Sequence, residues 1–105
     1  MDAFAAATDA LFADPNIARD AIWRAGGAGA GIAVRVVARR PDQVVGFGDS
    51  RVIMPAVLIE MRRSEVPEPA TGDTVEIDGE TFEIIATPIA DGLRLVWTCD
   101  AALKA

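Results

Sequence analysis

Hydrophobic and polar residues alternate most regularly in residues 72–99 of the chain. Val75 and Ile77 alternate with polar neighbours, which is the period-two pattern of a strand with one buried face. Asp78-Gly79 follows directly and predicts a type I′ hairpin turn, because both central residues of this turn need a positive φ. The strand after the turn has its apolar residues on one face: Phe82, Ile84 and Ala86.

A third alternating run follows a second turn at Ala90-Asp91-Gly92. The apolar face of this run comprises Leu93, Leu95, Trp97 and Cys99. We expect Trp97 to be buried against Phe82, because both residues lie on the apolar face of one three-stranded meander. Such a meander forms half of a small antiparallel barrel or sandwich.

Three further strands are expected upstream of the meander: Ile17–Arg24, Ile32–Arg40 and Val52–Arg63. Alternate residues of the last one are apolar and share a face: Val57, Ile59 and Met61. Pro55 removes a hydrogen-bond donor, so this segment is an edge strand, a bulge or two short strands. Ser64–Ala70, which contains two prolines, is a stiff connector into the meander. The predicted fold is mainly β: about six strands in a small antiparallel barrel or sandwich with one short N-terminal α-helix.

Asp2–Ala13 is the only segment whose sequence pattern is a good candidate for that helix. Asp2 can cap its N-terminus, and Asp14-Pro15 ends it, because the residue before a proline avoids the helical region. Its large apolar residues fall on one face: Phe4, Leu11 and Phe12. An isolated helix of this length is marginal in water, so it docks either on its own barrel or on a neighbouring subunit.

Two segments of the chain are expected to be irregular. The run Gly26–Gly31 lacks the spacing of a dinucleotide-binding fingerprint and the Gly-Lys-Ser/Thr ending of a P-loop, and a strand follows it. We interpret it as a flexible hairpin connection. The polar segment Pro41–Arg51 is a long loop that contains three apolar residues: Val44, Val45 and Phe47. These residues either fold back as a small cluster or contact a partner.

The amino-acid composition favours a single globular domain and argues against several kinds of site. The chain has 105 residues, 51% of them hydrophobic, which suits a single domain with a helical arm at residues 1–15 and a barrel at residues 16–105. It has no histidine and one cysteine, so neither a disulfide within the chain nor a Cys/His zinc site is expected. No apolar run approaches the ~20 residues that span a bilayer, and we expect no membrane association and synthesis in the cytoplasm.

The sequence gives little indication of a catalytic site. No histidine is present to act as a base, and Cys99 lies on the apolar face of a predicted core strand. The carboxylates near the hairpin lie on its outward face or in its turn: Glu76, Asp78, Glu80 and Glu83. We therefore expect no catalytic residues, no cofactor and no metal ion.

The charge pattern favours association between proteins. A net charge of −6 argues against a protein whose main role is to bind nucleic acid. Residues 64–84 contain seven acidic residues and no basic one, whereas Arg35, Arg39 and Arg40 belong to a basic segment. Separated patches of opposite sign suit head-to-side association of copies, although a solvated surface with chance clustering gives the same pattern.

A family resemblance rests on the patterned region and its motifs. They are Gly72-Asp73-Thr74 at a strand start, the acidic-glycine turn Asp78-Gly79, Glu80-Thr81-Phe82, and Leu93-x-Leu95-x-Trp97. Together they resemble the C-terminal half of lambda-type phage head–tail joining proteins, and the likeness extends upstream through Pro55–Val66. The glycine-rich hairpin and the pair Arg39-Arg40 do not map onto this family.

The resemblance implies a structural protein of a tailed phage, a prophage or a phage-derived gene transfer particle. Such proteins form a ring, usually a hexamer, between the portal or its adaptor and the tail terminator. The ring acts as a stopper that helps to retain double-stranded DNA in the lumen without sequence-specific binding, and it provides the tail attachment surface. The candidate interface residues are Phe4, Leu11, Phe12, Arg35, Arg39, Arg40, Val44, Val45 and Phe47. The alternatives are a small-ligand or nucleic-acid-binding β-barrel, or a tail terminator or tail-tube component.

Overall fold

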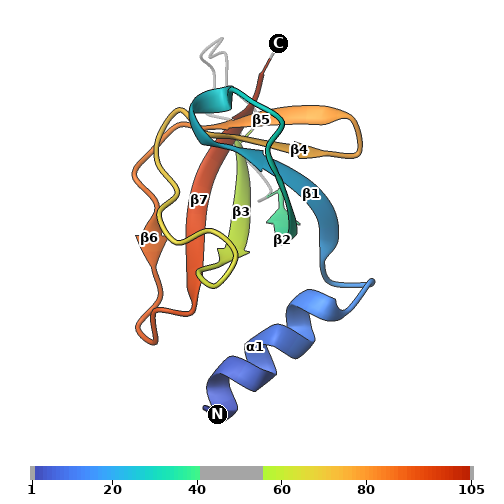
Figure 1. The fold of residues 1–105 in the computed structure, drawn as a ribbon, viewed down its shortest axis with the longest axis vertical. Helices are drawn as coiled ribbons and strands as arrows, with labels where there is room; N and C mark the ends of the chain where they lie inside the picture. Colours follow the sequence, from blue (N-terminus) through green and yellow to red (C-terminus); the bar gives the residue numbers. More distant parts are fainter. Residues whose placement is uncertain (1, 41–55, 105) are drawn as a thin grey trace, which may run out of the picture.

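The computed structural model describes residues 2–40 and 56–104. Within these ranges the fold is a closed antiparallel barrel of six strands with one additional short strand and one N-terminal helix (Figure 1). The mainly β fold with a single short helix is therefore confirmed. The elements in chain order are α1 (Ala3–Ala13), β1 (Arg19–Arg24), the 3-10 turn η1 (Ala25–Gly27), β2 (Ile32–Arg39), β3 (Ala56–Arg62), β4 (Thr74–Ile77), β5 (Glu80–Ile84), β6 (Ile89–Ala90) and β7 (Val96–Leu103).

Strand β7 closes the barrel. The strand order is β3-β2-β1-β4-β5-β7, and β3 pairs with β7 along its whole length, from Ala56 opposite Ala102 to Arg62 opposite Val96. The other edge of β7 is shared by two strands, because β5 pairs with its C-terminal half and β6 with its N-terminal half. The meander expected from the sequence is thus interrupted by β6, and its last strand also pairs outside the meander.

The core lies inside the barrel and follows the alternation of the strands. The inward residues of β3 are fully buried, as predicted: Val57, Ile59 and Met61. On β7 the inward residues Cys99 and Ala101 are also buried. Trp23 and Trp97 are half-buried and pack against this cluster from its margins.

The start of β7 and the position of Trp97 differ from the sequence-based expectation. The strand begins at Val96, and Leu93 lies in the preceding turn with 56% of its surface exposed. The turn is held because Oδ1 of Asp91 accepts hydrogen bonds from the backbone N–H groups of Leu95 and Val96. Trp97 therefore lies opposite Ala90 and Met61.

The expected packing of Trp97 against Phe82 is consequently wrong. Phe82 lies opposite Leu103, at the other end of β7. Six residues of extended chain separate Trp97 from Leu103, a span of about 20 Å. Alternation identifies the inward face of β7, but it does not determine the register, which decides which residues meet across two strands.

Both predicted hairpins are present. Asp78 and Gly79 have φ values of 51° and 83°, as a type I′ turn between β4 and β5 requires. The glycine-rich run joins the antiparallel strands β1 and β2, and a strand follows it. Gly31 is needed there, because a Cβ atom on this residue would lie 2.6 Å from Cγ2 of Ile22. Pro55 and the loop Pro41–Arg51 lie outside the described residues.

The N-terminal helix forms as predicted. Oδ1 of Asp2 accepts a hydrogen bond from the backbone N–H of Phe4 at 3.0 Å, and the helix ends before Asp14. In Figure 1 the helix lies at the lower end of the barrel, where it packs against β2 and β3. Of its three large apolar residues only Phe12 is buried, whereas Phe4 and Leu11 are 62% and 51% exposed.

Candidate functional site

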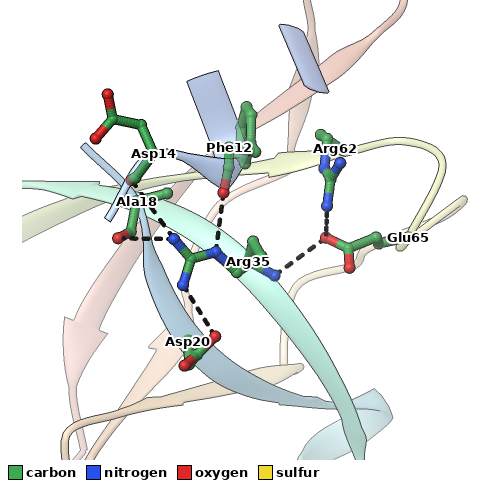
Figure 2. A network of polar contacts seen from close by, with 7 residues as sticks. All are labelled: Phe12, Asp14, Ala18, Asp20, Arg35, Arg62 and Glu65. Carbon is green, nitrogen blue, oxygen red and sulfur yellow. Dashed lines mark hydrogen bonds and ion pairs between the residues drawn. The ribbon is translucent and has the colours of Figure 1, made fainter. Parts of the chain in front are cut away.

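The junction between α1 and the barrel is organised by Arg35 of β2 (Figure 2). Its guanidinium group donates hydrogen bonds to the carbonyl oxygens of Phe12 at 2.9 Å, Ala18 at 3.2 Å and Asp14 at 3.5 Å. It also forms an ion pair with Asp20 at 2.9 Å. The last carbonyl groups of a helix have no partner within the helix, so Arg35 satisfies acceptors that would otherwise depend on water. The end of α1 is therefore fixed to β2 through one side chain.

A second arginine attaches the middle of the helix to β3. Arg62 forms ion pairs with Asp9 of α1 at 3.1 Å and with Glu65 at 2.9 Å. Its guanidinium group also lies 5.4 Å from the ring centroid of Phe12. Burial lowers the pKa of Arg62, but its hydrogen bonds to Glu65 and Asp9 outweigh this, and the net pKa is raised. Glu65 joins the two anchors, because it also accepts a hydrogen bond from the backbone N–H of Arg35 at 3.0 Å (Figure 2).

An apolar groove of about 430 Å³ lies beside the helix, against the outer face of β2, β3 and β7. We call it the helix groove. Its apolar lining consists of Leu11, Phe12, Ile17, Val37 and Val96. The residues of the outer face lie in one row across the strands, because Val37 is opposite Glu60 and Glu60 is opposite Thr98. The apolar part of the groove is suited to an apolar protein segment, and of its polar lining residues Arg39 and Glu60 pair with each other.

The predicted basic residues Arg39 and Arg40 are paired within the chain. Arg39 lines the helix groove and forms an ion pair with Glu60 at 2.6 Å, and the hydrogen bond from this pair raises its pKa. Arg40 lies 3.5 Å from Glu80 and 5.6 Å from the ring centroid of Phe82. Together with Arg35, these residues do not form one free basic patch. Their contact with a neighbouring subunit stays a prediction.

The acidic hairpin is likewise not separate from the basic strands. Its carboxylates pair with two arginines of β1 and with the arginine that follows β2, through Arg24–Glu76, Arg19–Asp78 and Arg40–Glu80. The expectation of well-separated patches of opposite charge is therefore corrected. The reason is topological, because β4 pairs with β1 and so brings the two charged segments side by side.

A polar cavity of about 310 Å³ lies at one end of the barrel. Core residues Val57, Ile77 and Phe82 line its apolar part, and the charged residues of the neighbouring ion pairs line the rest. Among residues 2–40 and 56–104, no group of three or more His, Cys, Asp or Glu side chains could hold a metal ion. In the same part of the chain no helix is long and apolar enough to cross a membrane.

The thiol of Cys99 is unsuited to nucleophilic chemistry. It is completely buried, and burial together with the charges of Asp73 and Asp100 raises its pKa to about 12. A thiol reacts as the thiolate, so a pKa this high leaves it unreactive near neutral pH.

Phe4, Leu11 and Phe12 are the predicted interface residues that come together at the helix, and Leu11 and Phe12 line the helix groove. Val44, Val45 and Phe47 lie outside the described residues. Sequence reasoning missed Arg62 and Asp73, which hold the helix and the turn before β4. Gly72-Asp73-Thr74 was noted only as a strand start, and no local pattern indicates that Asp73 is buried and accepts three hydrogen bonds.

Comparison with known proteins identifies a family for this chain. A model of the phage head–tail attachment protein family matches residues 1–101 of the chain. No curated protein matches the chain at a significant level.

Proposed function

Because the chain belongs to the phage head–tail attachment family, we propose that copies of it form a stopper ring at the joint between the head and the tail. Membership of this family makes it a structural protein of a phage particle that contacts other head and tail proteins. The ring is a hexamer placed between the portal or its adaptor and the tail terminator. It belongs to a phage, a prophage or a gene transfer particle, and it carries no catalytic activity.

The observation that carries this proposal is the helix groove with the exposed apolar residues beside it. Leu11 and Ile17 line the groove and remain substantially exposed, and Phe4 on the same helix is exposed further. A contiguous apolar surface of this kind is typical of a site where another protein binds. We infer that a neighbouring subunit covers this groove in the ring.

A closed barrel favours contacts of this kind. Most of its strands are already paired on both sides, so two subunits cannot form a continuous sheet by pairing long strands with each other. The remaining route is packing of side chains, with an apolar centre and a polar rim. In the helix groove the apolar walls supply the centre, and the pair Arg39–Glu60 supplies a polar margin.

The net charge of −6 fits passage of DNA better than binding of DNA. A ring with a surplus of negative charge repels phosphate groups and does not hold the duplex at a fixed register. Retention of DNA then depends on a steric block or on partner proteins. We propose that DNA in the lumen makes no sequence-specific contact with this chain.

The test of this function replaces one exposed residue of the groove. Leu11→Asp places a charge in the proposed contact, and Ala6→Asp places the same charge on the exposed opposite side of α1. We expect the purified Leu11→Asp protein to stay folded and filled heads made with it to lack tails. Heads made with Ala6→Asp should join tails normally. Infectious particles at the parental level from Leu11→Asp would contradict the proposal.

A further inference from the structure

A second pocket, of about 270 Å³, lies on the other side of α1, between the helix and the turn that precedes β7. We call it the arginine pocket. Its lining includes Arg62, Arg63 and Arg94 together with the hydroxyl-bearing residues Thr8 and Ser64. We propose that this pocket binds a carboxylate group of a second copy of the chain, namely the acidic pair Glu83 and Asp100. The inference rests on the proposed ring and names one contact within it.

The ion pairs of the chain leave two cations in this pocket. Six arginines of the described residues form ion pairs with carboxylates of the same chain: Arg19, Arg24, Arg35, Arg39, Arg40 and Arg62. Arg63 and Arg94 form none within residues 2–40 and 56–104, and both line the arginine pocket. In an acidic chain where most arginines are paired, two unpaired cations in one hollow indicate an anionic ligand.

Local contacts position the side chain of Arg63 and the backbone of Arg94 at the pocket. Arg63 lies 5.9 Å from the ring centroid of Trp97. Arg94 has a φ of 57°, and its backbone N–H donates a hydrogen bond to the carbonyl oxygen of Asp91 at 3.0 Å. A left-handed backbone is uncommon for a residue other than glycine, and such strain concentrates at functional positions. The planar guanidinium groups of Arg63 and Arg94 suit a planar carboxylate, which accepts two parallel hydrogen bonds.

The acidic pair lies on another face of the same chain. Glu83 is opposite Ala102, and Asp100 is two residues before Ala102 on β7. Alternation puts both carboxylates on the outer face, where diagonal neighbours are about 7–8 Å apart. Neither forms an ion pair within the described residues, and Asp100 is exposed. The pair is therefore available to a partner.

The two surfaces lie too far apart to meet within one chain. Arg94 precedes β7, and Asp100 lies in its C-terminal half, so at least four strand residues, about 13 Å, separate them. Contact between different surfaces of two copies is heterologous, and a heterologous contact that closes on itself generates a ring. The charge complementarity of the surfaces therefore fits the symmetry that the proposed function needs.

Duplex DNA is the less suitable anion for the arginine pocket. Its phosphates form a continuous line of charge, about one charge per 1.7 Å of axis, and proteins bind it with an extended basic surface. Here the unpaired arginines occupy one hollow that also contains Asp9, on a chain with a net charge of −6. A single carboxylate with its flanking side chains matches the pocket in size and charge.

The contact can be tested on the purified chain by following amide NMR shifts as the protein concentration rises. We expect residues around Arg63 and Arg94 to shift together with residues around Glu83 and Asp100. Arg94→Glu should weaken this self-association at least about tenfold, and Arg94→Glu combined with Asp100→Arg should restore it. Arg19→Glu makes the same charge change at an exposed site outside the pocket and should have little effect. Shifts at neither surface, or saturable binding of a short duplex DNA at Arg63 and Arg94 at physiological salt, would overturn the inference.

A cross-linking experiment in assembled particles separates this inference from the proposed function. Arg63→Cys combined with Glu83→Cys should give, on oxidation, a ladder of covalent oligomers up to the closed ring. Each single variant should give no ladder, and the native Cys99 is buried and does not interfere. Absence of the ladder in particles that carry the chain at the joint would overturn this contact and leave the ring intact. Absence of the chain from the joint would overturn the proposed function itself.

Discussion

The indole Nε1–H group of Trp23 donates a hydrogen bond to Oδ2 of Asp73 at 3.1 Å and thereby joins β1 to the turn before β4. The same carboxylate accepts hydrogen bonds from the backbone N–H groups of Gly26 and Ala70, both at 2.8 Å. Asp73 is only 5% exposed, so these donors replace water around its negative charge. One side chain thus fixes β1, the glycine-rich hairpin and the connector to β4.

Asp73→Ala should destabilise the barrel by about 2–4 kcal/mol, because it removes the charged acceptor of three part-buried hydrogen bonds. Chemical denaturation followed by tryptophan fluorescence measures this loss. Glu80→Ala is the matched control, because it removes a carboxylate from an exposed ion pair and should cost less than about 1 kcal/mol. Equal costs for the two variants would show that the hydrogen bonds of Asp73 are not important for stability.

Phe82→Ala should cost about 3–5 kcal/mol, because the side chain is 3% exposed and its removal leaves a cavity. Trp97→Ala should cost less, about 1–3 kcal/mol, because the indole is half-buried at the margin of the core. The two losses should add within about 0.5 kcal/mol, since the residues lie at opposite ends of β7. Strong coupling in a double-mutant cycle would place the two rings in contact and contradict the observed register.

Arg35→Gln should release α1 while leaving the barrel folded. The substitution removes the hydrogen bonds to the carbonyl groups of Phe12 in the helix and Ala18 after it, and the ion pair with Asp20, at a cost of about 1.5–3 kcal/mol. Hydrogen exchange should show protection of α1 in the parent protein and its loss in Arg35→Gln, with unchanged protection in β3 and β7. The sequence leaves open whether α1 docks on its own barrel or on a neighbouring subunit, and an unprotected α1 in the parent protein would favour the neighbouring subunit.

Alkaline pH should destabilise the folded chain through Cys99. Its pKa is raised to about 12 by burial and then by the charges of Asp73 and Asp100, whereas an unfolded cysteine titrates near 8.5. Because the folded-state pKa is the higher one, this stability is complete below the unfolded pKa and is lost as the pH rises toward 12. The free energy of unfolding, measured in urea over this pH range, should fall more steeply for the parent than for Cys99→Ala. Parallel pH profiles for the two proteins would contradict the prediction.

The sequence indicated the features of this fold that depend on neighbours along the chain. Asp78-Gly79 identified the hairpin, and alternation identified the buried face of β3. The capping by Asp2 and the stop at Asp14-Pro15 located α1 within one residue. Each of these patterns depends only on residues that are close together in the sequence, so it can be recognised without the structure.

The features that were missed depend on residues distant in sequence. Closure of the barrel by β3 and β7 follows from no local pattern, and the late start of β7 depends on one side chain, Asp91, bonding to its own turn. The charge patches were misjudged for the same reason, because the pairing of β1 with β4 brings Arg24 beside Glu76. A pocket-lining arginine such as Arg94 becomes recognisable only once the ion pairs of the other arginines are known.

Closure through β7 also determines when the chain becomes competent to assemble. The barrel depends on pairings such as Ile22 with Glu76 and Ile59 with Cys99, which join residues far apart in the sequence. Folds dominated by such pairings are slow, typically milliseconds to seconds, because long loops must close before native contacts form. Until β7 pairs with β3 and β5, the open edges of these two strands can pair with other chains, which leads to aggregation. A newly made chain therefore has to complete its barrel before it can act at the head–tail joint, and folding rate becomes a limit on the yield of joined particles.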